Sequence, residues 1–262
     1  MNKYAVNLST IFTEVPFIER FKKAKQAGFN FVECQFPYSV PVSTIREELE
    51  MNQLSLVLIN IPAGDWENGE RGLAIYPERI PEFKESVATG IEYAQGLGVK
   101  KLHCLAGIVP VDMNPALARK TYIENLTFAA EQLAAHGMTL LIEPINQFDM
   151  PGYFLNDIKE AVEIVEEINL PNVKLQFDFY HIQKTKGNLL ANFTNYMDKI
   201  EHIQVADVPG RHEPNTGEIY YQRVLAEVCN NGYRGFIGLE YIPLGKSEDS
   251  FSWIELYQRG EK

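Results

Sequence analysis

Four short runs decide how this chain folds: LLIEP at residues 140–144, KLQFD at 174–178, HIQVAD at 202–207 and GLEYIP at 238–243. Each combines apolar residues with a polar, oxygen-bearing side chain at or near its end, as strands do where they leave a parallel sheet. Longer segments with the period of an amphipathic helix lie between them. This alternation predicts βα units around a parallel sheet.

The same alternation continues along the rest of the chain. We expect eight strands, at residues 4–12, 29–36, 54–61, 100–107, 138–145, 173–180, 202–208 and 236–242. Helical patterns occupy residues 16–27, 43–53, 81–97, 114–136, 156–168, 188–199, 221–230 and 250–258. Eight such units in 262 residues predict an α/β protein with one domain, residues 1–262, folded as a (β/α)₈ TIM barrel.

Glycines mark the ends of four helical segments. Gly28, Gly98, Gly137 and Gly232 each follow a helical pattern and precede a strand. Glycine adopts the left-handed conformation of a helix C-cap at little cost, so this repeat favours one architecture throughout. The sequence has no G-x-G-x-x-G or Walker-type loop and gives no support for a dinucleotide or nucleoside-triphosphate site.

The composition bounds the class of protein. A 45% hydrophobic content can bury one large core. The net charge of −11 repels polyphosphate, and no run of Lys or Arg supplies a basic patch, so we expect no nucleic-acid partner. No apolar segment approaches a membrane span, and the N-terminus makes a poor signal peptide. We expect a cytoplasmic protein with reduced cysteines, and apolar helix faces would allow a homo-oligomer.

Four side chains stand at or near the C-terminal ends of four successive strands: Glu143, Asp178, Gln204 and Glu240. Residues two apart in a strand share a face, and this alternation directs all four into the barrel. Carboxylates there are costly to desolvate unless a cation or a partner neutralises them. Because all four offer oxygen ligands, we expect a divalent metal site that suits Mg²⁺ or Mn²⁺.

Such a site suits proton transfer beside a carbonyl. A cation chelated by a carbonyl and a neighbouring hydroxyl acidifies the C–H between them, and a glutamate can remove that proton. Returning a proton to the other carbon of the metal-held enediolate exchanges aldehyde and ketone. Arg211 and His181 lie near the expected mouth of the barrel, where Arg211 can hold the carboxylate of an anionic substrate.

The order of the motifs resembles that of a known family. The motifs are GFNFVE at Gly28 to Glu33, E-P at Glu143, D-x-x-H at Asp178 to His181, Q-V-A-D at Gln204, R-H-E-P at Arg211 to Pro214 and L-E-Y at Leu239 to Tyr241. Together they are similar to the xylose isomerase-like TIM barrels, and within them to the hydroxypyruvate isomerase group, which includes the 2-oxotetronate isomerases. The likeness covers nearly the whole chain.

This resemblance implies an isomerase that acts on a small anionic hydroxy-oxo acid. Hydroxypyruvate would become tartronate semialdehyde, or a 2-oxotetronate would become a 3-oxotetronate. The resemblance also implies that Glu143 and Glu240 are the acid–base pair, that Glu143, Asp178, Gln204 and Glu240 bind the metal, and that His181 and Arg211 contact substrate oxygens. Many relatives have histidine at the position of Gln204, which implies weaker metal retention here.

Three other functions stay open on the sequence. A ketose 3-epimerase would use the same metal and glutamates but return the proton to the opposite face of one carbon. An abasic-site endonuclease on this barrel would need three zinc ions, but the histidine expected around Asn60 is absent and Gln204 replaces another. A metal-free barrel would act as a binder or scaffold without turnover.

Two loops at the C-terminal side of the strands are long or polar, at residues 62–79, with Trp66, and at 209–218. Long loops on that face are usually lids or binding loops. Further candidates are Glu33, Tyr38, Asn60 and His103, with His202 as a support for Gln204.

Overall fold

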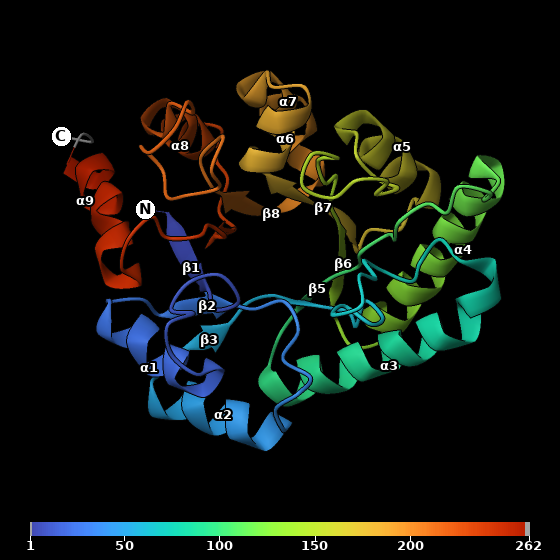
Figure 1. The fold of residues 1–262 in the computed structure, drawn as a ribbon, viewed down its shortest axis with the longest axis horizontal. Coiled ribbons are helices and arrows are strands. Elements are labelled where there is room, and N and C mark those ends of the chain that lie inside the picture. The colour runs from blue at the N-terminus through green and yellow to red at the C-terminus, as the bar shows by residue number, and fades with distance from the viewer. Residues whose placement is uncertain (1, 260–262) are drawn as a thin grey trace.

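The computed structural model describes residues 2–259. Parallel strands form a cylinder at the centre of the molecule, and helices surround it (Figure 1). The strand order is β3-β2-β1-β9-β8-β7-β6-β5-β4, and neighbouring strands pair in parallel. The predicted TIM barrel is confirmed.

The strands lie at the predicted runs and are shorter than predicted. They are β1 (Lys3–Asn7), β2 (Phe31–Glu33), β3 (Ser55–Leu56), β4 (Ile59–Asn60), β5 (Lys101–His103), β6 (Thr139–Ile142), β7 (Val173–Asp178), β8 (Ile200–Val205) and β9 (Phe236–Leu239). Each predicted run overlaps one strand, except that residues 54–61 contain both β3 and β4; β1 and β8 begin one and two residues before their predicted runs.

The run at residues 54–61 closes the cylinder. Its first part, β3, pairs with β2, and its second part, β4, pairs with β5. Between them the Val57 N–H donates to the Val32 carbonyl at 2.9 Å, and the Leu58 carbonyl accepts from the Cys34 N–H at 3.2 Å. Because this one run contacts both edges of the sheet, eight βα units form a closed barrel.

The helices form the outer ring in Figure 1. They are α1 (Phe17–Gln26), α2 (Val42–Met51), α3 (Ile80–Leu97), α4 (Pro115–Ala134), α5 (Ile158–Ile168), α6 (Phe179–Thr185), α7 (Leu189–Tyr196), α8 (Tyr221–Asn230) and α9 (Ser252–Arg259). Three 3-10 turns are η1 (Pro77–Arg79), η2 (Met197–Lys199) and η3 (Ser247–Phe251). Within residues 2–259, the structure contains no helix with the length and apolar character needed to cross a membrane.

Helix α6 differs from the prediction. The strand expected at residues 173–180 ends at Asp178, and the chain turns directly into α6. The Asp178 carboxylate accepts a hydrogen bond of 2.8 Å from the Tyr180 N–H, which caps the helix. His181 therefore lies on the first turn of a helix. The glycines expected at helix ends are confirmed, since Gly28, Gly98, Gly137 and Gly232 all have positive φ.

The alternation of side chains along the strands is confirmed. Outward-facing residues, among them Ile142, Phe177, Ile203 and Leu239, join the apolar cluster between strands and helices. Inside the barrel a second apolar cluster contains Ala5, Val57, Leu58 and Leu141. Further along the interior the buried side chains become polar: Asn7, Glu33, Gln176, His202 and Gln204.

Glu33 is the centre of this polar interior and is fully buried. Its Oε2 accepts from His202 Nε2 at 2.7 Å, and its Oε1 accepts from Gln204 Nε2 at 2.8 Å and from Asn7 Nδ2 at 3.1 Å. Gly238 on β9 leaves the space for this carboxylate, because a Cβ at residue 238 would lie 2.4 Å from Glu33 Oε1. Both carboxylate oxygens are thus fully engaged by protein donors.

We expect Gly238→Ala to destabilise the fold by about 1–3 kcal/mol, because the added methyl group would displace a carboxylate that the barrel holds on several sides. Denaturant unfolding followed by circular dichroism measures the loss. Gly245→Ala is the control, since an added Cβ there meets nothing within 4 Å among the described residues. Equal stabilities of the two variants would contradict the packing argument.

Candidate active site

The four side chains predicted at the strand ends converge at one end of the barrel. Glu143 follows β6, Asp178 ends β7, Gln204 lies in β8 and Glu240 follows β9. Each is at most 4% exposed. Asp178 and Gln204 are direct neighbours in the sheet register. The prediction that these groups gather inside the barrel therefore agrees with the structure.

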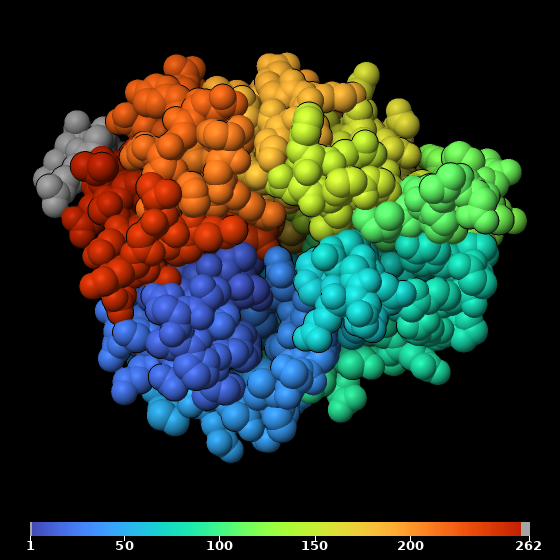
Figure 2. Space-filling model, in the orientation of Figure 1, coloured from blue at the N-terminus to red at the C-terminus, as the bar shows by residue number. Residues whose placement is uncertain are grey.

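A cavity of about 240 Å³ lies at this end of the barrel. Glu143, Glu240, His181 and Arg211 all contribute to its walls. The face in Figure 2 is hollowed near its centre, between the blue N-terminal segments and the cyan segments beside them. Four of the six predicted site residues thus share one small cavity, and the other two, Asp178 and Gln204, are buried beside it.

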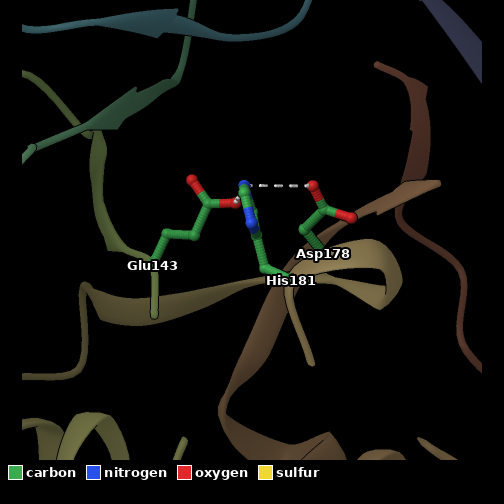
Figure 3. A group of neighbouring side chains, drawn as sticks. All are labelled: Glu143, Asp178 and His181. Atoms are coloured by element: carbon green, nitrogen blue, oxygen red, sulfur yellow. Dashed lines mark ion pairs between the residues drawn. The ribbon is translucent and has the colours of Figure 1, made fainter. Parts of the chain in front are cut away.

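Two carboxylate oxygens at this site are buried and have no hydrogen-bond partner within residues 2–259: Glu143 Oε1 and Asp178 Oδ2. Their companion oxygens accept from Gln176 Nε2 at 2.9 Å and from the Tyr180 N–H at 2.8 Å. His181 Nε2 lies 4.0 Å from Glu143 Oε1 and 3.7 Å from Asp178 Oδ2 (Figure 3).

This arrangement fits a divalent cation. Glu143 and Asp178 each offer a carboxylate oxygen, and these two oxygens and a ring nitrogen of His181 all lie within 4.8 Å of one another. Buried carboxylate oxygens without donors are unfavourable, and a hard cation is the partner that suits them.

Glu240 is more fully paired than Glu143. Its Oε1 accepts from Asn7 Nδ2 at 3.0 Å and from Gln35 Nε2 at 2.9 Å, and its Oε2 accepts from Arg211 Nη2 at 2.8 Å. The same Nη2 lies 3.6 Å from Asp178 Oδ2. Arg211 therefore places positive charge between two buried carboxylates.

The 209–218 loop presents Arg211 to the cavity. Arg211 has a left-handed φ of 57°, and its guanidinium carbon lies 5.1 Å from the centre of the Tyr180 ring. The buried Asp207 carboxylate ties the loop together by accepting from the backbone N–H groups of Asn215 and Ile219, both at 3.0 Å. The loop therefore contributes Arg211 to the wall of the cavity, and its role as a binding loop stays a prediction.

Burial raises the pKa of all three carboxyl groups. Desolvation raises the pKa of Glu143 well above its usual value, and the charges of Glu240 and Asp178 raise it further. Burial also raises the pKa of Asp178 to about 7 and that of Glu240, although Arg211 opposes both shifts. Burial lowers the pKa of His181 well below its usual value, so its ring is neutral near pH 7.

Gln204 takes part in a chain of amide hydrogen bonds. Its Nε2 donates to Glu33, and its Oε1 accepts from Gln176 Nε2 at 2.7 Å; the same nitrogen of Gln176 donates to Glu143. His202, expected to support Gln204, reaches it through Glu33. Coordination of a metal by Gln204 stays a prediction.

Other candidates from the sequence have separate positions. His103 lines the cavity with its Nε2 3.6 Å from Glu143 Oε2, and burial lowers its pKa to about 3. Asn60 also lines the cavity, whereas the Tyr38 hydroxyl donates to the Asn60 carbonyl. Trp66 from the 62–79 loop lines the cavity and packs against Phe36, with ring centres 4.9 Å apart.

Among the residues that line the cavity, sequence reasoning missed Gln35, Arg71 and Asp149. Gln35 could have been found, because it follows Glu33 by two positions and so continues its face of the strand. Arg71 stacks on Trp66, with its guanidinium carbon 4.0 Å from the ring centre. Arg71 and Asp149 lie in loops, where no periodicity indicates direction.

Comparison with known proteins extends the likeness over the whole barrel. The xylose isomerase-like TIM barrel family matches residues 21–257. Hydroxypyruvate isomerase of Escherichia coli (strain K12) is 42% identical over 98% of this chain and 100% of its own length. 2-oxo-tetronate isomerase of Cupriavidus necator is 42% identical over 98% of this chain and 99% of its own. A crystal structure described as AP endonuclease, family 2, from Brucella melitensis has a TM-score of 0.96 and 43% identity, covering 98% of this chain and 99% of that one.

The raised pKa of Glu143 predicts how the stability of the folded protein changes with pH. Between the unfolded-state pKa of this group and its higher folded-state pKa the folded protein binds more protons, so its contribution to stability falls as pH rises through that range. Glutamine does not titrate. We therefore expect metal-free Glu143→Gln to gain stability relative to the unsubstituted protein over this range, by up to about 1.4 kcal/mol per pH unit.

Calorimetric unfolding in the presence of a chelator measures this difference. The buried histidines are common to both proteins, so their opposite pH dependence largely cancels. Glu85→Gln, an exposed change on α3, should leave the difference flat with pH. The difference in the free energy of unfolding between Glu143→Gln and the unsubstituted protein should grow with pH. A difference that is constant, or that shrinks as pH rises, would show that folding does not raise the pKa of the Glu143 carboxyl group.

Proposed function

The chain belongs to the xylose isomerase-like TIM barrel family and is an isomerase, and we propose that its substrate is a small anionic hydroxy-oxo acid. The reaction moves a carbonyl group between adjacent carbons, as in the conversion of hydroxypyruvate to tartronate semialdehyde or of a 2-oxotetronate to a 3-oxotetronate. The names of the two relatives that are 42% identical over nearly their full length support this substrate class.

One observation carries the proposal: two glutamates and two hydrogen-bond donors line one cavity. Glu143 and Glu240 supply carboxylates for proton transfer, and His181 and Arg211 supply donors for substrate oxygens. A volume of about 240 Å³ is below the range of pockets for drug-sized ligands, which suits an acid of three or four carbons.

Glu143 is the group best prepared to take the first proton. Its Oε1 is buried and without a partner in the described chain, and burial raises its pKa, which makes it a stronger base. It removes the proton from the carbon that bears the hydroxyl, and the electron pair moves toward the carbonyl oxygen. Glu240, which starts protonated because burial raises its pKa, gives that proton to the former carbonyl carbon, while the hydroxyl proton passes to the former carbonyl oxygen. Exchange with water then removes the proton from Glu143 and returns one to Glu240.

The cation proposed for this site is Mg²⁺ or Mn²⁺, held by Glu143, Asp178, Gln204 and Glu240. When bound, it would supply positive charge that acidifies the substrate C–H. The two unpartnered oxygens of Glu143 and Asp178 support this placement. Arg211 supports the choice of an anionic substrate, because it is the cation of the cavity wall that lies against Glu240 and can instead pair with a substrate carboxylate.

Nucleic-acid cleavage is an alternative function, because the similar Brucella melitensis structure is described as an AP endonuclease. The net charge of −11 opposes binding of a polyanion, and the cavity is small and rich in carboxylates. Epimerisation of a ketose would use the same glutamates, so substrate and product must separate these reactions.

Incubation of the protein in heavy water with hydroxypyruvate, 2-oxotetronates and neutral ketoses tests the function directly. We expect deuterium incorporation and carbonyl migration with an oxo acid, and loss of turnover with a chelator. Glu143→Gln and Glu240→Gln should each lower kcat by roughly 10²- to 10⁴-fold, the usual contribution of a general acid or base. Glu85→Gln should be unaffected, and full activity of either site variant would refute the mechanism.

Arg211→Lys tests the recognition of the substrate carboxylate. Lysine keeps the charge but loses the planar fork that binds a carboxylate through two hydrogen bonds. We expect KM for the oxo acid to rise by roughly tenfold or more, which corresponds to about 1.4 kcal/mol. Turnover of an uncharged analogue should change much less, and equal effects on both compounds would exclude a carboxylate contact at Arg211.

A further inference from the structure

His181 receives hydrogen bonds at its Nδ1 atom from two donors of Asn146. The side-chain Nδ2 lies at 2.6 Å and the backbone N–H at 3.4 Å. A backbone N–H can only donate, so Nδ1 must carry a lone pair. A neutral imidazole with its lone pair at Nδ1 carries its proton on Nε2.

The orientation of the Asn146 amide is fixed independently of His181. Its Oδ1 accepts from the backbone N–H groups of Phe148 and Asp149, both at 3.0 Å. Its Nδ2 also donates to Asp149 Oδ2 at 3.1 Å. All the hydrogen-bonding positions of the amide are therefore used. A half-turn of the amide would set donor against donor and oxygen against carboxylate, and Asn146 is fully buried.

Asp149, which accepts a hydrogen bond from Asn146 Nδ2, is itself bound to side chains of α6. Asp149 accepts from Lys184 Nζ at 2.6 Å and from the Tyr180 hydroxyl at 2.7 Å. Both donors lie on the helix that carries His181. The loop after β6 and helix α6 are thus joined around the imidazole ring, which leaves Nε2 directed at the cavity.

We propose that Asn146 is a positioning residue that locks His181 in the tautomer protonated at Nε2. Nε2–H faces the gap between Glu143 Oε1 and Asp178 Oδ2, at 4.0 Å and 3.7 Å. A protonated nitrogen has no lone pair for a cation, so His181 acts as a hydrogen-bond donor and does not join the two carboxylates as a metal ligand. The nature of the accepting substrate oxygen rests on the proposed function; the tautomer does not.

Nitrogen-15 NMR of the histidine rings tests the lock without any substrate. Two-bond proton–nitrogen spectra distinguish the two neutral tautomers, and loss of one signal set in His181→Gln assigns His181 among the five histidines. We expect the metal-free protein to show His181 protonated at Nε2. Protonation at Nδ1, or an equal mixture, would overturn the proposal.

Asn146→Asp reverses the polarity of the contact, because a carboxylate accepts a proton from Nδ1–H and frees the lone pair of Nε2. We expect the ring to shift toward the Nδ1-protonated form and the affinity for Zn²⁺, a cation that favours nitrogen ligands, to rise about 10- to 100-fold in titration calorimetry. Gln147→Glu adds the same charge at the next, exposed residue and should change neither property.

Two outcomes of the Asn146→Asp measurements would refute the proposal. An unchanged tautomer in Asn146→Asp would refute the lock, and a switched tautomer without tighter Zn²⁺ binding would refute its effect on the cation. If Asn146→Asp does not fold, Asn146→Ala keeps the backbone donor alone and should give a mixture of tautomers; a single unchanged form would again refute the role of the side chain. Because no turnover is measured, failure here is distinct from failure of the proposed reaction.

Discussion

Desolvation of carboxylates inside a closed barrel is the constraint on which this site depends. Glu33, Glu143, Asp178 and Glu240 are all at most 4% exposed, and a charge so placed is unfavourable unless something compensates it. The barrel responds by surrounding these groups with amides, imidazoles and one guanidinium. Many of the polar side chains inside the barrel are therefore needed because four carboxylates are buried there.

These buried carboxylates differ in how many of their oxygens accept hydrogen bonds. The difference distinguishes a carboxylate that stabilises the fold from carboxylates that are available for reaction. Both oxygens of Glu33 accept hydrogen bonds from Asn7, His202 and Gln204. Glu143 and Asp178 each have one buried oxygen without a partner in the part of the chain described. The paired carboxylate of Glu33 contributes to the fold, whereas Glu143 and Asp178 each keep a free lone pair, and burial raises the pKa of both. The second state is the one that proton transfer and cation binding require.

Neutral hydrogen-bond donors and the guanidinium of Arg211 together surround the carboxylates of this site. Gln176 connects Glu143 to Gln204, and Gln204 connects to Glu33, so the orientation of each amide depends on the next. Arg211 supplies charge that a substrate carboxylate can compete for, because its guanidinium contacts Glu240 from a loop and not from a strand. The side chains on the strands thus hold the carboxylates in place, whereas Arg211 on its loop can exchange Glu240 for a substrate carboxylate.

The sequence alone determined the barrel and the convergence of Glu143, Asp178 and Glu240, because strand alternation is local and parallel strands all present their C-terminal ends on one side. It did not determine α6, whose start depends on the Asp178 carboxylate capping the Tyr180 N–H. Nor did it determine the roles of Asn146, Asp149 and Arg71. These residues lie in loops, whose paths are set by contacts with distant segments, and only the tertiary structure decided which atoms of His181 and its neighbours face each other.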